Sequence, residues 1–146
     1  MPVGTVNKPD LPEKYLVSAC LAGFCTRYDA RIKTSSACME LLKGALWVPV
    51  CPEQLGGLAT PRTPADLVGG NGSDVLACKA NVVTRSGEDV TAQFIKGAHQ
   101  CLEIVQAQNI QTACLKAGSP SCGLNPKIGV TAALLQQHGI RIIEFR

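Results

Sequence analysis

Three of the eight cysteines stand just after apolar runs that are typical of strands, each in a polar, turn-rich segment: Cys20, Cys51 and Cys122. Open α/β sheets place their reactive groups beyond the carboxyl ends of the strands. Three thiolates that meet there can hold a soft metal or an iron–sulfur cluster. Three protein ligands instead of four would leave one metal position open for chemistry.

Polar side chains in the same segments can serve such a centre. Glu53 is suited to general acid–base work if a substrate lies within hydrogen-bond reach, although a loop carboxylate is more often simply solvated. The hydroxyls of Ser119 and Ser121 either form a turn or orient a substrate. Arg62, in a proline-rich stretch, is either an anion contact or a surface arginine. On the functional interpretation, Arg62 and Ser121 contact the substrate.

The other five cysteines have surroundings that favour different roles. Free cysteine is among the most buried residue types, and Cys38, Cys101 and Cys114 fall inside predicted helices or strands, so we expect them in the core. Cys78, near a predicted β-ribbon, is also expected to be structural. Cys25 lies in the first of the three cysteine loops and is a fourth ligand, a resolving thiol or a bystander.

Composition excludes several classes of protein. The 146 residues, 46% of them hydrophobic, predict one domain over residues 14–146 after a flexible leader over residues 1–13. The net charge of +3, without a Lys/Arg run, disfavours a mainly electrostatic nucleic-acid binder. The start resembles no signal peptide, and no segment has the length of a membrane span. We therefore expect a reduced, cytoplasmic protein in which clustered cysteines serve metal binding or catalysis.

Metal and catalytic motifs of other kinds are missing from the sequence. There is no Cys-x-x-Cys pair, so neither a zinc ribbon nor a thioredoxin motif is supported. His99 and His138 both fall on predicted helices, and a Ser-His-Asp or Cys-His triad therefore gets little support.

Apolar runs and helical periodicities alternate along the chain. The predicted strands are residues 15–19, 45–50, 112–115 and 140–145. The predicted helices are residues 37–43, 90–108 and 130–138. Residues 56–72 are predicted as a long loop, and residues 75–77 and 81–84 as an antiparallel ribbon. The alternation predicts the α/β class, a single Rossmann-like domain with a mainly parallel sheet flanked by helices.

Four strings of unusual sequence follow one another from about Tyr15 to the end of the chain. They are SACLAG with RYD, CPEQLGGLATPR, SPSCG and GVTAALL. In content and order they resemble a bacterial family of thiouracil desulfidases, formerly a family of unknown function. The second and third strings are long enough to make this resemblance specific.

The resemblance implies a [4Fe-4S] enzyme that converts 2- or 4-thiouracil, a small thiolated pyrimidine, into uracil and sulfide without net redox change. Cys20, Cys51 and Cys122 would be the cluster ligands, and one iron would stay free to take up the substrate sulfur as a Lewis acid. The matching positions for the acid–base residue and the assisting hydroxyl are Glu53 and Ser119.

The chain departs from the family pattern at two places. Ala30 stands where the family commonly has glycine, and only residues 124–128 stand where the family has a longer Gly-rich stretch. The short segment keeps a second hypothesis open, a non-catalytic carrier of an iron–sulfur cluster or of sulfide. A third hypothesis is a zinc-binding domain in which Cys25 joins the three cysteines.

Overall fold

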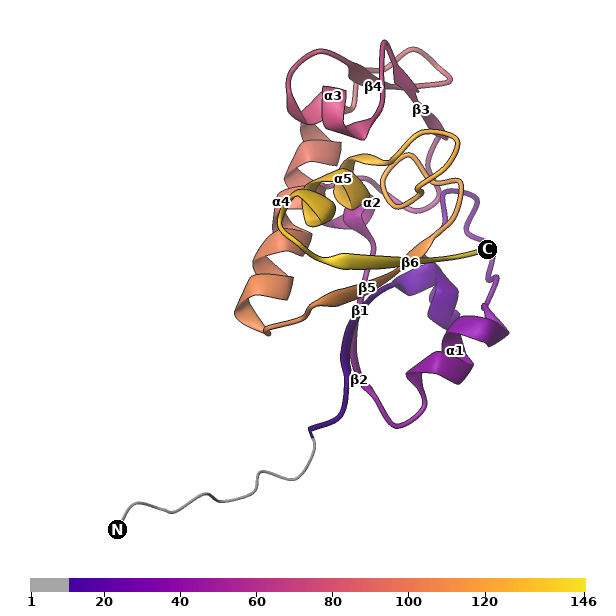
Figure 1. Cartoon of the computed structure of the whole chain (residues 1–146). Coiled ribbons are helices and arrows are strands. Elements are labelled where there is room, and N and C mark those ends of the chain that lie inside the picture. The colour runs from indigo at the N-terminus through magenta and orange to yellow at the C-terminus, as the bar shows by residue number, and fades with distance from the viewer. Residues whose placement is uncertain (1–10) are drawn as a thin grey trace.

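Four parallel strands form the main sheet of the computed structural model, which describes residues 11–146. The predicted leader therefore lies almost wholly outside the described residues. The strands β1 (Lys14–Ser18), β2 (Leu46–Val50), β5 (Thr112–Lys116) and β6 (Arg141–Phe145) pair in the order β2-β1-β5-β6. This parallel sheet, with helices on both sides, confirms the predicted fold class (Figure 1).

The register of the sheet brings the carboxyl ends of neighbouring strands to one edge. Ser18, the last residue of β1, stands opposite Val50, the last residue of β2. On the other side of β1, Val17 stands opposite Cys114 near the end of β5. The loops that follow these strands therefore begin side by side, although they lie far apart in the sequence.

Helices cover both faces because successive residues of a strand point to opposite sides. On one face, Leu16 packs in the larger core cluster with α4 (Thr91–Ala107) and α5 (Val130–Gln137). On the other face, Tyr15 and Val17 pack in a second cluster with α1 (Ser36–Leu42). Figure 1 shows α4 and α5 together on one side of the sheet and α1 on the other.

The long helix α4 owes its position to one apolar face. Its buried residues recur at steps of three and four: Phe94, Gly97, Ala98, Cys101, Leu102 and Val105. The predicted burial of Cys38, Cys101 and Cys114 is confirmed. Cys78, expected to be structural, is instead exposed just past α3 (Gly72–Leu76).

The predicted ribbon is wrong in one of its two strands. Its second strand, β4 (Asn81–Thr84), exists but pairs with β3 (Ala65–Val68), which lies within the predicted loop. Residues 75–77 instead belong to the end of α3 and the turn after it. Asn71 and Asp74 start this helix with a capping box, in which each side chain accepts the other's backbone N–H. An apolar run as short as residues 75–77 does not distinguish a helix from a strand.

A close backbone contact holds the short helix α2 (Pro52–Leu55) against α4. A Cβ atom on Gly97 of α4 would overlap the carbonyl oxygen of Pro52, and one on Gly56 would overlap the carbonyl oxygen of Gln93. Only glycine permits this approach, which fixes α2 in front of the sheet edge. None of the helices in residues 11–146 has the length and apolar content that a membrane crossing needs.

We expect the substitution Gly97→Ala to destabilise the protein by about 1–3 kcal/mol, because the added methyl group overpacks the contact with α2. The better helix propensity of alanine, worth about 1 kcal/mol, offsets part of the loss. Urea denaturation measures the effect. His99→Ala, on the exposed side of the same helix, is the control and should change stability by less than about 0.5 kcal/mol. Equal stability of Gly97→Ala and wild type would contradict the close approach of α4 to the backbone of α2.

Candidate active site

A cavity of about 730 Å³ lies beyond the carboxyl ends of β1, β2 and β5. The turn η1 (Ala19–Ala22) carries Cys20, Cys51 is the N-cap residue of α2, and Cys122 lies in the loop after β5. All three cysteines line this cavity. The structure thus brings the three thiols to one site, because the three strands end at one edge.

The three thiols differ in burial but influence one another. Cys122 is 3% exposed, whereas Cys20 and Cys51 are partly exposed. Burial raises the pKa of all three thiols, and it raises the pKa of Cys122 to about 12. The neighbouring Cys20 and Cys51 raise the pKa of Cys122 further, since like charges repel. Three thiolates here need a compensating positive charge, which a metal centre supplies.

The three cysteines do not form a ready-made site for a single metal ion. Within residues 11–146, no three His, Cys, Asp or Glu side chains are placed to hold one metal ion. Thiolates that bind separate irons of a cluster lie further apart than ligands of one ion. Cys25, the fourth zinc ligand of the alternative hypothesis, is exposed and absent from the cavity lining, and its thiol donates to the Ala30 carbonyl at 3.3 Å.

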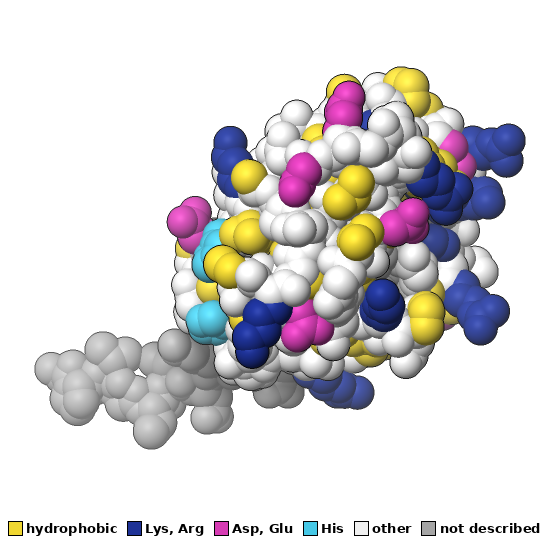
Figure 2. All heavy atoms as spheres, turned by 90° about the horizontal axis from the view of Figure 1, so that it is seen from above, with side chains coloured by type: hydrophobic (Ala, Val, Ile, Leu, Met, Phe, Trp, Pro, Cys, Tyr) yellow, Lys and Arg dark blue, Asp and Glu magenta, His cyan; other side chains and the backbone are white. Residues whose placement is uncertain are grey.

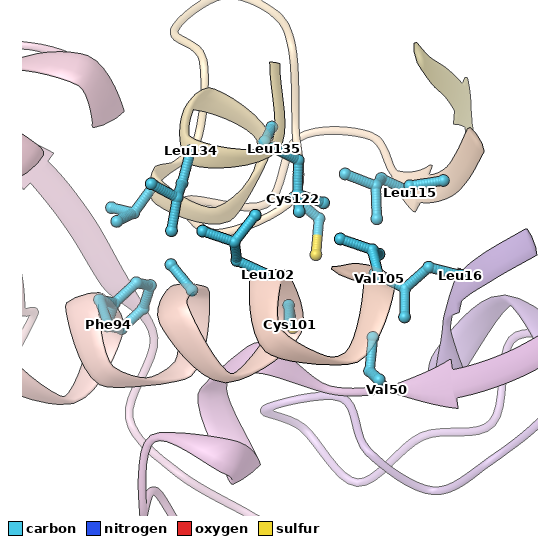
Figure 3. Close-up of a cluster of buried hydrophobic side chains, with 14 of the residues drawn as sticks. Leu16, Val50, Phe94, Cys101, Leu102, Val105, Leu115, Cys122, Leu134 and Leu135 are labelled. Carbon is cyan, nitrogen blue, oxygen red and sulfur yellow. The ribbon is translucent and has the colours of Figure 1, made fainter. Parts of the chain in front are cut away.

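Cys122 stands between the cavity and the hydrophobic core. Figure 3 shows its side chain pointing from the loop towards α4, where Cys101, Leu102 and Val105 lie. Residues of the core therefore surround one side of this thiol, while its loop faces the cavity. The packing of the core therefore holds the Cys122 side chain in place.

Glu53 and the two serines form one line of hydrogen bonds along the cavity wall. The Ser121 hydroxyl donates to Oε2 of Glu53 at 3.0 Å, and Ser119 Oγ lies 2.9 Å from Ser121 Oγ. The Ser121 hydroxyl also lies 3.6 Å from Sγ of Cys122, and since its single hydrogen serves one of these two acceptors, Ser119 donates to Ser121. Ser119 Oγ in turn accepts the backbone N–H groups of Ser121 and Cys122, both at 3.2 Å. A proton can therefore pass along a defined path between Ser119 and Glu53.

Arg62 lines the cavity, but its donors already have partners in the protein. Nε donates to Oε1 of Glu53 at 2.9 Å, and Nη1 donates to the Ala59 carbonyl and the Thr60 hydroxyl. Nη2 donates to the Thr26 carbonyl at 2.9 Å and lies 3.8 Å from Sγ of Cys51. These contacts hold Glu53 and tie together two loops of the site. A contact between Arg62 and substrate stays a prediction.

More cations than carboxylates line the cavity. Its lining contains the side chains of Arg27, Arg62, Arg85, Lys116 and Lys127 against those of Glu53 and Asp66. In the view from above, Lys and Arg side chains gather along the right-hand edge of the molecule (Figure 2). Nearby cationic side chains stabilise thiolates and other negatively charged groups.

Several features of the site have no counterpart in the sequence predictions. The short helix α2 places Glu53 in its first turn, and Pro52 at the first helical position was the signal that could have revealed it. Lys116 and Tyr28 also line the cavity. The short segment 124–128 contributes three residues to the lining, and its Leu124 N–H donates to the carboxylate of Glu144. This segment therefore forms part of the cavity wall.

Comparisons with known proteins agree on one family. The model of the 2-thiouracil desulfurase family matches residues 15–145. YbbK, an uncharacterized protein of Bacillus subtilis (strain 168), is 44% identical over 140 residues, which are 88% of this chain and 93% of that protein. A solved structure of a [4Fe-4S]-dependent thiouracil desulfidase, TudS, superposes with a TM-score of 0.74 at 41% identity and covers 90% of both chains.

We expect Arg62→Ala to lower the free energy of unfolding by about 1–3 kcal/mol, since it leaves the partly buried carboxylate of Glu53 without its cation. The two side chains are only 10% and 14% exposed. The matched control is Arg85→Ala, whose ion pair with Asp66 is 68% and 60% exposed, and which should cost less than about 1 kcal/mol. Chemical denaturation measures the stability of both variants. Equal losses of stability would show that the contacts of Arg62 contribute no more than an exposed ion pair does.

Proposed function

Because the chain belongs to the 2-thiouracil desulfurase family, we propose that it converts 2- or 4-thiouracil into uracil and sulfide with a [4Fe-4S] cluster as cofactor. The observation that carries this proposal is the convergence of three thiols and one hydrogen-bonded carboxylate on the same cavity. The volume of the cavity, about 730 Å³, lies within the usual range of pockets for small molecules.

In this proposal Cys20, Cys51 and Cys122 hold the cluster, and no fourth cysteine among residues 11–146 lines the cavity. When bound, the cluster would supply an iron without a protein ligand, a Lewis acid matched to the soft sulfur of a thiocarbonyl group. The cationic lining of the cavity suits the negative charge that three thiolates carry.

Glu53 acts as the general base on the water that attacks the thiocarbonyl carbon. Arg62 and Ser121 each hold one oxygen of its carboxylate, so the group has a fixed orientation. Once both hydroxyls have turned to donate in the opposite direction, a proton taken up by Glu53 can return along Ser121 and Ser119 towards the ring or the departing sulfide. The water oxygen replaces sulfur on the ring and sulfide leaves with the carbon–sulfur electron pair, so the hydrolysis needs neither an oxidant nor a reductant.

The two alternative hypotheses gain no support from the described residues. The carrier hypothesis depends on a cavity left bare by the short segment 124–128, yet residues of this segment line the cavity. The zinc hypothesis needs Cys25 beside the other ligands, and Cys25 lies outside the cavity lining. We place the reaction in the cytoplasm, where reducing conditions keep all eight cysteines as the free thiols seen here.

Cluster binding is tested by anaerobic reconstitution with iron and sulfide. The wild-type protein should take up iron, acquire the visible absorbance of a thiolate-bound cluster and release uracil and sulfide over many turnovers. Cys51→Ser should lose most of the iron and the activity, because one ligand is removed. Cys25→Ser, a matched cysteine outside the cavity, should keep both. Iron uptake by Cys51→Ser equal to that of wild type would contradict the ligand assignment.

The acid–base role is tested by Glu53→Gln in the loaded protein. The variant should keep its iron and lose about 10²–10⁴-fold in kcat, the usual contribution of a general base. Turnover by wild type in ¹⁸O-labelled water, without a reductant, should place the label in uracil. Unlabelled uracil, or an absolute need for a reductant, would exclude the hydrolytic step.

A further inference from the structure

Within the part of the chain that the structure describes, Tyr28 is the one aromatic residue that lines the cavity. The remaining aromatic residues lie elsewhere: Tyr15, Trp47, Phe94 and Phe145 pack in the two core clusters, and Phe24 is exposed outside the cavity lining. Tyr28 leaves 42% of its surface exposed, although it is a large and partly apolar residue. An aromatic residue that lines a cavity without being buried is available to a ligand.

The surroundings of Tyr28 hold it in one place. The guanidinium of Arg27 lies over its ring, 5.7 Å from the ring centre. Arg27 is itself fixed by two hydrogen bonds to the Asp29 carboxylate, both at 3.1 Å, and its side chain is only 14% exposed. The Tyr28 carbonyl accepts the backbone N–H of Arg62 at 2.9 Å. The residue is therefore anchored through its backbone on the side of the Glu53 network and through its ring by Arg27.

This arrangement has the chemistry of a stacking surface. Because Arg27 lies over one face of the ring, the stacking proposed below uses the opposite face. The remaining apolar side chains of the lining are aliphatic, proline or cysteine, which present no aromatic face. A pyrimidine ring is flat and carries no charged group, so stacking is its main source of affinity apart from hydrogen bonds at its edge.

We propose that the substrate pyrimidine stacks on the ring of Tyr28, and that this contact selects heteroaromatic thiocarbonyl compounds over aliphatic ones. The inference rests on the proposed function of the cavity and adds a binding residue to it. Tyr28 binds the ring that reacts; Glu53 and the cysteines act at its edge. The hydroxyl of Tyr28 has no part in the contact, because the ring face alone supplies it.

The test uses the cluster-loaded protein under anaerobic conditions, with uracil as the equilibrium ligand and 2-thiouracil as the substrate. Tyr28→Leu, which keeps the bulk but not the ring, should raise the Kd for uracil and the KM for 2-thiouracil by about 10- to 100-fold. Its kcat should change little, because stacking holds ground state and transition state alike. Tyr28→Phe should bind as wild type does, and Tyr28→Trp at least as tightly.

The matched control is Phe24→Leu, an exposed aromatic residue of the same loop that does not line the cavity, and it should leave both constants unchanged. Iron content and the unfolding midpoint of each variant separate a binding effect from a folding defect. An unchanged Kd in Tyr28→Leu, or an equal loss in Tyr28→Phe, would overturn the stacking role. Wild-type protein that binds uracil but releases no sulfide would instead contradict the proposed function, while the comparison of Kd values would still decide on Tyr28.

Discussion

The parallel pairing of β1 with β2 and β5 is the constraint on which the site depends. Hydrogen bonds between these strands set Ser18 opposite Val50 and Val17 opposite Cys114, so the three following loops start at one edge of the sheet. A shift of one strand by a single residue would turn its side chains to the other face and exchange the two core clusters. The packing of Leu16 on one face and Val17 on the other therefore fixes both the register and the place of the cavity.

A second layer of contacts turns this edge into a rigid site. The glycine contact between α2 and α4 sets the position of the helix that carries Glu53, and Arg62 joins that helix to the loop of Thr26. The carboxylate of Glu53 receives one donor on each oxygen, from Arg62 and from Ser121. A carboxylate held in this way is oriented before any ligand binds.

The sequence predicts the parts of this architecture that depend on local pattern. Short apolar runs that end in polar turns locate the strands, and the three-to-four spacing of Phe94, Ala98 and Leu102 locates α4. The sequence predicts a loop in place of strand β3, because these four residues lie in a stretch rich in Gly, Pro and Thr and form a strand only through pairing with β4. The partners of Arg62 come from segments separated by up to 36 residues, and no local pattern reveals such contacts. The position of Tyr28 in the cavity lining is equally unpredictable from the sequence, since nothing in the string Arg-Tyr-Asp indicates that the tyrosine borders a cavity.

The three proposed ligands are spread over most of the chain, on loops that follow three different strands. During synthesis, the growing polypeptide has no complete thiol triad until β5 and the loop after it have emerged. A cluster held by all three proposed ligands can therefore form only after most of the chain has been made, because metal binding is coupled to the folding that assembles the site.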